Sequence, residues 1–137
     1  MSYLVDLAKN VYKENNSSDI YDILINALLK IEDNLNPKII TNIVEIKYLT
    51  YLGVGLNLDG CSVCGLTSVV SMSYNKGGYV CINHVGKDKV MDDVTLKLFK
   101  AYYYIDISKI SELNIKEKVV NEIDHFLNIY YKEYTGL

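Results

Sequence analysis

The chain has 137 residues, of which 50% are hydrophobic and 23% are charged. This composition is typical of one compact globular domain and excludes a disordered chain. Fourteen basic residues, all of them lysines, stand against 17 acidic residues, so the net charge is −3. Because arginine and a basic face normally provide phosphate binding, an autonomous DNA-binding domain of high affinity is not expected.

Hydropathy and cysteine usage indicate the cellular compartment in which the protein is located. No apolar run approaches the roughly 20 residues that span a bilayer. The first residues lack the basic region and apolar core of a secretory signal. Three cysteines arranged as metal half-sites fit a reducing environment better than a disulfide framework. We therefore expect a cytoplasmic protein without a membrane partner.

Helical periodicity dominates the first 53 residues. Apolar side chains at helical spacing predict amphipathic helices over roughly residues 2–13 and 18–33. A third helix is predicted to open at Asn36-Pro37, since proline needs no N–H at a first helical position, and to stop at Gly53. This helix is apolar around much of its circumference, which predicts that it is buried.

The segment from about residue 58 to 86 has a different character. Cys61-Ser62-Val63-Cys64-Gly65 is followed by Cys81-Ile82-Asn83-His84, with 16 residues between Cys64 and Cys81. Thiolates and imidazole are preferred zinc ligands, four of them close a tetrahedral site, and the spacing matches a zinc ribbon. The alternative is coincidence, with small buried cysteines and an ordinary surface histidine. We predict a structural Zn²⁺ held by Cys61, Cys64, Cys81 and His84. Four protein ligands leave no position for activating water, so no enzyme is expected.

A hairpin is predicted between the two half-sites. Val70, Met72 and Tyr74 alternate with serines, residues 75–78 are turn formers, and residues 79–81 can return as the partner strand. Such a hairpin folds the chain back, so that the second half-site meets the first.

Two more helices are predicted in the remainder of the chain. Asp92 or Asp93 opens the fourth, and Asn114 with Glu117 three residues later resembles a capping box that opens the fifth. The predicted fold is mainly α: a single domain over 1–137, with a bundle of about five helices (1–53 and 92–135) and an inserted zinc-ribbon-like β-hairpin at about 58–86.

These motifs resemble those of a known family. The run from Val44 to Gly53, a short loop and then Cys61-Ser62-Val63-Cys64-Gly65 is similar to RecO, a bacterial recombination and repair mediator. In that family a helix reading F-E-x-x-L-L-x-x-L-G leads into C-x-x-C-G, and G-G-x-x-C-x-x-C follows. Here Val44 stands at the phenylalanine position and His84 at the fourth cysteine. The resemblance covers only the C-terminal part of RecO. The resemblance implies that this chain is a piece of a longer protein, that the piece lacks the family's N-terminal OB-fold, and that Met1 is an introduced start.

The resemblance also implies a function. RecO-like proteins anneal single strands and, with RecR, help load RecA at gaps coated by single-stranded-DNA-binding protein. The resemblance implies that single- and double-stranded DNA binds mainly to the missing OB-fold. It also implies a location in the bacterial cytoplasm, in association with the nucleoid. The helical domain is expected to be structural and to receive the acidic, Phe-ended tail of single-stranded-DNA-binding protein.

Such a tail needs an apolar pocket and a cation. The candidates are Lys38 and Lys47 on the third helix, beside Tyr48 or Tyr51 as exposed apolar neighbours. Two other functional classes stay open. A stand-alone zinc-ribbon nucleic-acid-binding or transcription-associated protein would need a basic face, and a metalloenzyme would need a vacant metal position with a nearby general base.

Overall fold

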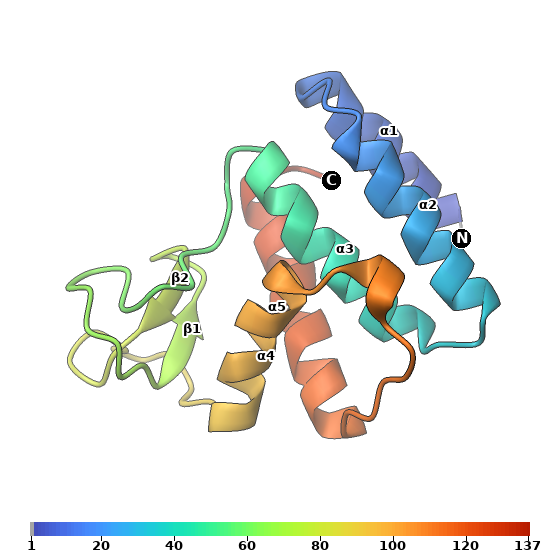
Figure 1. The fold of residues 1–137 in the computed structure, drawn as a ribbon. Helices are drawn as coiled ribbons and strands as arrows, with labels where there is room; N and C mark the ends of the chain where they lie inside the picture. Colours follow the sequence, from blue (N-terminus) through green and yellow to red (C-terminus); the bar gives the residue numbers. More distant parts are fainter. Residues whose placement is uncertain (1) are drawn as a thin grey trace.

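A computed structural model describes residues 2–137; Met1, and with it the expectation of an introduced start, lies outside this range. Five α-helices, a short 3₁₀ helix and two short strands follow one another along the chain (Figure 1). Their bounds are α1 Ser2–Glu14, α2 Asp19–Glu32, α3 Pro37–Tyr51, β1 Ser71–Ser73, β2 Gly78–Val80, α4 Asp93–Tyr104, η1 Ile107–Lys109 and α5 Glu117–Tyr134. The predicted class, a mainly helical protein with an inserted hairpin, is confirmed.

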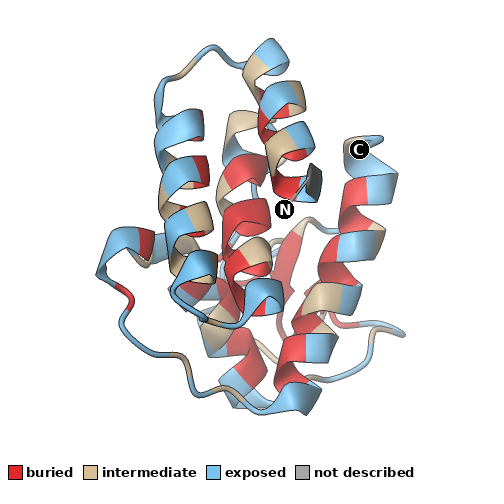
Figure 2. Ribbon diagram, turned by 90° about the vertical axis from the view of Figure 1, so that its right-hand side faces the viewer, coloured by how far each residue is buried: buried red, intermediate tan, exposed pale blue. Residues whose placement is uncertain are grey.

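Helix α3 lies at the centre of the bundle. It begins as predicted, because the Asn36 side chain accepts hydrogen bonds from the N–H groups of Lys38 and Ile39 and Pro37 occupies the first turn. It ends before Gly53, whose φ of 79° is the left-handed conformation that favours glycine. Most of α3 is buried, as Figure 2 shows for the central helix.

The other helices cover α3 from two sides. Helices α1 and α2 pack together and against α3, while α4 and α5 contact α3 and each other (Figure 1). Each contributes one apolar face, for example Leu4, Leu7, Ala8 and Val11 of α1. These faces join α3 in one continuous core. Helix packing therefore leaves the lysines of α3 at the edges of the bundle.

The last helix begins later than predicted. Helix α5 starts at Glu117 after Lys116, so the capping box at Asn114 was wrong. The reason lies in the residues between: Leu113 and Ile115 are both half-buried against the core. Side chains two positions apart share one side of an extended chain, whereas on a helix they diverge. Packing thus keeps this connection extended up to residue 116.

The hairpin projects from one side of the bundle (Figure 1). Its strands pair antiparallel, with Ser71 opposite Val80 and Met72 opposite Tyr79. The turn spans residues 74–77 and includes the predicted Gly77. Gly78 instead begins β2, and it lies so close to the backbone of Asn57 that a side chain there would collide with it. We call residues 57–86 the insert. Among the described residues, no helix combines the length and apolar character that crossing a membrane requires.

Candidate functional site

The insert brings all four predicted metal ligands together. The three sulfur atoms and one ring nitrogen of Cys61, Cys64, Cys81 and His84 all lie within 4.8 Å of one another. The Cys64 and Cys81 sulfurs are 3.7 Å apart, and His84 Nδ1 lies 3.3 Å from the Cys81 sulfur. These cysteines are free thiols rather than disulfides. The four donors are therefore close enough to hold one metal ion.

Two tight turns aim these side chains at one point. In the first, the Gly65 N–H donates to the Cys61 carbonyl over 2.8 Å, and Gly65 has a φ of 80°. In the second, the His84 N–H donates to the Cys81 carbonyl over 3.0 Å. The Ser62 N–H donates to the Tyr79 carbonyl over 2.7 Å, which ties the first turn to strand β2. The hairpin thus fixes the distance between the half-sites.

Backbone hydrogen bonds also favour the thiolate form of Cys61. Burial acts to raise the pKa of the Cys61 thiol, but hydrogen bonds from the backbone of Cys64, Val63 and Cys81 outweigh it and lower that pKa to about 5. The pKa of the Cys64 thiol is raised: a backbone hydrogen bond from Leu66 opposes this, while burial and the neighbouring thiols act to raise it. The backbone around Cys61 therefore favours its thiolate form.

The donor set fits zinc. Zn–S and Zn–N bonds of about 2.3 and 2.0–2.1 Å place tetrahedral ligands roughly 3.5–3.8 Å apart. Three of the six separations between the four donor atoms are 3.3, 3.7 and 3.7 Å, close to this value, and none exceeds 4.8 Å. Three soft thiolates with one imidazole exclude the oxygen-preferring cations Mg²⁺ and Ca²⁺ as natural occupants.

Comparison with known proteins identifies the family. The family model described as recombination protein O, C terminal, matches residues 1–137. The chain belongs to this RecO family. It is 27% identical to the DNA repair protein RecO of Bacillus cytotoxicus over 99% of this chain and 57% of that protein. It is 29% identical to the DNA repair protein RecO of Exiguobacterium sibiricum over 98% of this chain and 56% of that protein.

The match confirms the resemblance to the C-terminal part of RecO. The chain spans somewhat more than half the length of the curated RecO relatives that it matches. No solved structure gives a significant match to the chain.

The expectation that Tyr48 is exposed on this RecO-family domain was wrong. Its side chain is 0% exposed, and its hydroxyl donates to the Ile20 carbonyl of α2 over 2.7 Å. A helix that is apolar all round is covered on all sides, so a tyrosine in its middle packs inward and needs a buried acceptor. Tyr48 therefore holds α2 against α3, and no ligand can reach it in this fold.

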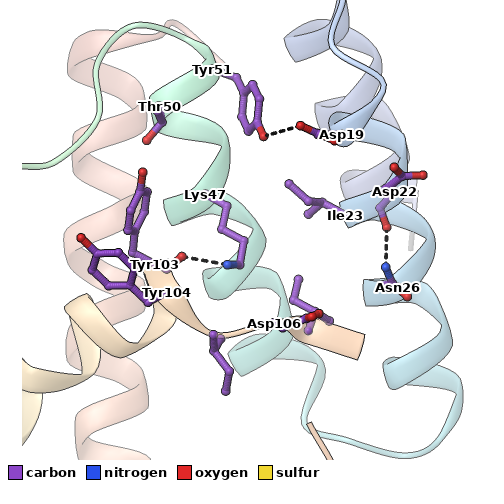
Figure 3. A pocket seen from close by; sticks show the side chains of 12 residues that line it. Asp19, Asp22, Ile23, Asn26, Lys47, Thr50, Tyr51, Tyr103, Tyr104 and Asp106 are labelled. Atoms are coloured by element: carbon purple, nitrogen blue, oxygen red, sulfur yellow. Dashed lines mark hydrogen bonds between the residues drawn. The ribbon is translucent and has the colours of Figure 1, made fainter. Parts of the chain in front are cut away.

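The structure does not bring Lys38 and Lys47 together. Nine residues apart on one helix, they lie on opposite faces and about 13 Å apart along the axis. Lys38 is exposed, donates to the Asn121 side chain over 3.2 Å, and borders a depression shared with Lys132 and Pro37. Lys47 lies instead in a pocket between α2, α3 and the chain that follows α4 (Figure 3). The candidate residues thus define two separate places.

The Lys47 pocket contains residues that the sequence did not single out. Tyr51 lines it as a half-buried side chain, together with Tyr103 and Tyr104 from the end of α4 and with three aspartates. The lining aspartates are Asp19, Asp22 and Asp106. These residues come from segments far apart in the chain, and no spacing pattern connects them, so only the fold could reveal the pocket. We call it the acidic-aromatic pocket.

Proposed function

We propose that the chain is the metal-stapled, partner-docking domain of a bacterial RecO-like DNA repair protein. The observation that carries this proposal is the family match over the whole chain, together with the four zinc-type ligands that the fold brings close together. The proposed process is recombinational repair in the cytoplasm: annealing of single strands and, with RecR, loading of RecA at gaps coated by single-stranded-DNA-binding protein. DNA contact is assigned mainly to the part of RecO outside this domain.

In this proposal the metal is Zn²⁺ and its role is structural. Cys61, Cys64, Cys81 and His84 provide a complete tetrahedral set, so none of the four positions is open to water or substrate. Three thiolates and a neutral imidazole around a dication sum to −1, which makes the ion a poor Lewis acid. The domain is accordingly assigned a binding role rather than a catalytic one.

For the acidic, Phe-ended tail of single-stranded-DNA-binding protein, the Lys38 region is the better docking place. Lys38 and Lys132 border one depression, which also contains the apolar Pro37 and Leu137 and two acidic side chains, Glu45 and Asp124. Two lysines can meet carboxylates while the apolar side chains receive the phenylalanine. The surroundings of Lys47 are less suitable, because three aspartates stand against one lysine there, whereas two acidic and two basic side chains line the Lys38 depression.

Fluorescence anisotropy of labelled single-stranded DNA tests the assignment of DNA contact. We expect negligible or very weak binding of this chain at low and at moderate salt, because its lysines are balanced by a larger number of acidic residues. Tight binding with a steep salt dependence would overturn the docking-domain proposal in favour of a stand-alone nucleic-acid-binding module.

Calorimetry with a synthetic acidic, Phe-ended peptide tests the docking place. Lys38→Glu should weaken binding about tenfold, and Lys9→Glu on the exposed side of α1 serves as a control with the same charge change. Lys47→Glu separates the two candidate places. If it weakens the peptide and Lys38→Glu does not, the tail docks at the acidic-aromatic pocket and the Lys38 assignment is wrong.

A further inference from the structure

The acidic-aromatic pocket is a second candidate site, remote from the metal ligands. It has a volume of about 530 Å³, which lies in the range of pockets that hold a small ligand or a large side chain. In Figure 3, Asp19, Asp22 and Ile23 of α2 stand on one side, Tyr103 and Tyr104 on the other, and Lys47 lies between them. The pocket therefore joins three segments of the chain around one hollow.

Its charge is negative. Asp19, Asp22 and Asp106 line it, and none of these three forms an ion pair with another described residue. The single lining lysine is directed elsewhere: the Lys47 ammonium donates to the Tyr103 carbonyl over 2.8 Å. Burial lowers the pKa of Lys47, against the opposite effect of Asp106. The pocket therefore contains more carboxylate groups than cations.

The third property of the pocket is its aromatic wall. The rings of Tyr103 and Tyr104 lie 4.9 Å apart at 84°, so they present surfaces in two directions. Tyr104 is 63% exposed, which leaves a large apolar area uncovered at the end of α4. Aromatic faces attract ammonium and guanidinium groups, and they also pack against the apolar stems of lysine and arginine. Acidic and aromatic side chains together favour a cation that carries apolar atoms.

We propose that the acidic-aromatic pocket binds a lysine- or arginine-bearing peptide segment of a partner protein. The cationic head lies among Asp19, Asp22 and Asp106, and its stem lies against Tyr51 and the Tyr103–Tyr104 pair. The same charges repel nucleic-acid phosphates and acidic peptides, so this site and the Lys38 region select opposite ligands. The proposal goes beyond the assigned repair role and does not depend on the metal.

A pair of short fluorescein-labelled peptides tests the proposal. One carries arginine and lysine between leucines, and the other carries glutamate at the same positions. We expect the cationic peptide to bind and to shift the amide NMR signals of Lys47, Tyr51 and Tyr103. The glutamate peptide should leave these signals in place. Absence of pocket shifts with the cationic peptide at millimolar concentration would overturn the proposal.

Three variants locate the interaction. Asp19→Asn with Asp22→Asn should weaken the cationic peptide roughly fivefold, since two exposed charges are lost. Asp6→Asn with Asp33→Asn, exposed aspartates that do not line the pocket, should change the affinity little. Lys47→Met should strengthen binding about twofold, because it removes the competing cation. An equal loss of affinity in both aspartate pairs would mean that the peptide is attracted nonspecifically. Weaker binding by Lys47→Met would contradict the expected increase in affinity. Either result rejects the site.

Discussion

The helical bundle and the insert are stabilised by different means. The bundle has one continuous core to which all five helices contribute. The insert has two three-residue strands and a separate small cluster formed by Cys61, Val80, Cys81 and Val85. A two-stranded hairpin is at best marginally stable in water, and so small a cluster adds little. The comparison shows that apolar burial holds the bundle together, whereas the insert buries few apolar side chains of its own and instead carries the four candidate metal ligands.

Tyrosines join the two regions. Tyr74 of the insert stacks on Phe126 of α5, with ring centroids 4.6 Å apart, and the Tyr134 hydroxyl donates to the Tyr74 carbonyl over 2.5 Å. The Tyr79 side chain reaches back to α4, where its hydroxyl donates to the Leu96 carbonyl. One face of the hairpin therefore belongs to the bundle, while the metal ligands lie beyond it.

Removal of the metal should produce the largest difference between the regions. Structural zinc in finger peptides contributes on the order of 10–16 kcal/mol of apparent binding free energy. With a chelator, we expect proteases to cleave between about residues 58 and 86 while far-UV circular dichroism keeps its helical signal. His84→Ala should act like the chelator, whereas His125→Ala, on the exposed side of α5, should not. An unchanged digestion pattern after chelation would refute the separate stabilisation of the insert.

A substitution in the core should destabilise the helical bundle rather than the insert. Phe126 is 1% exposed and also contacts Phe99 edge-on, with ring centroids 5.2 Å apart. Phe126→Ala should lower the free energy of unfolding by about 3–5 kcal/mol, because it leaves a cavity in the shared core. Urea unfolding followed by circular dichroism measures this loss. The exposed Leu29→Ala provides the control and should change stability by less than about 1 kcal/mol.

The contact between Gly78 and the Asn57 backbone, which we call the neck of the insert, permits a test in which we expect a loss of stability of intermediate size. Gly78 combines a φ of 157° with direct contact to the Asn57 backbone, so Gly78→Ala should cost about 2–3 kcal/mol and loosen the neck. Gly53→Ala, at a φ of 79° with open space around it, should cost only about 1 kcal/mol. Hydrogen exchange should show faster opening at residues 57 and 79 in the first variant alone. Equal costs would mean that backbone conformation, not the close approach, requires Gly78.

The same contrast explains what the sequence could predict. The metal ligands were predictable because a zinc site is encoded in two short local motifs, and the third helix because Asn36, Pro37 and Gly53 mark its ends. The exposure of Tyr48 and the start of α5 were not, because each depends on what packs nearby: the Ile20 carbonyl in one case and the burial of Ile115 in the other. Of the acidic-aromatic pocket the sequence indicated only Lys47 and Tyr51, because its other lining residues come from α2 and from the end of α4 onward. Local motifs predict sites within one segment, and tertiary contacts decide the rest.

The smallest expected effect concerns a buried carboxylate in the bundle. Glu45 is 2% exposed and accepts hydrogen bonds from the Tyr3 hydroxyl over 2.7 Å and from the Asn42 amide over 3.0 Å. Burial raises the pKa of Glu45, and the nearby Asp124 raises it further, while the two hydrogen bonds oppose the shift. The folded state therefore holds the Glu45 proton more tightly than the unfolded chain does.

The sign of the pH dependence follows from this raised pKa. Its contribution to stability is complete below the ordinary carboxyl pKa of about 4.3 and is lost as pH rises through the folded pKa, because only then must a buried charge form. Glu45→Gln removes that charge and keeps the shape, so it should stabilise the bundle by about 1 kcal/mol at pH 8 and not at pH 4. Urea unfolding across this pH range measures the difference, with the exposed Glu32→Gln as control. Parallel stability curves for Glu45→Gln and the parent chain would show that Glu45 ionises in the folded state as easily as in water. The hydrogen bonds of Tyr3 and Asn42 would then offset its burial, and the bundle would hold a charge in its core without a metal or a cation beside it.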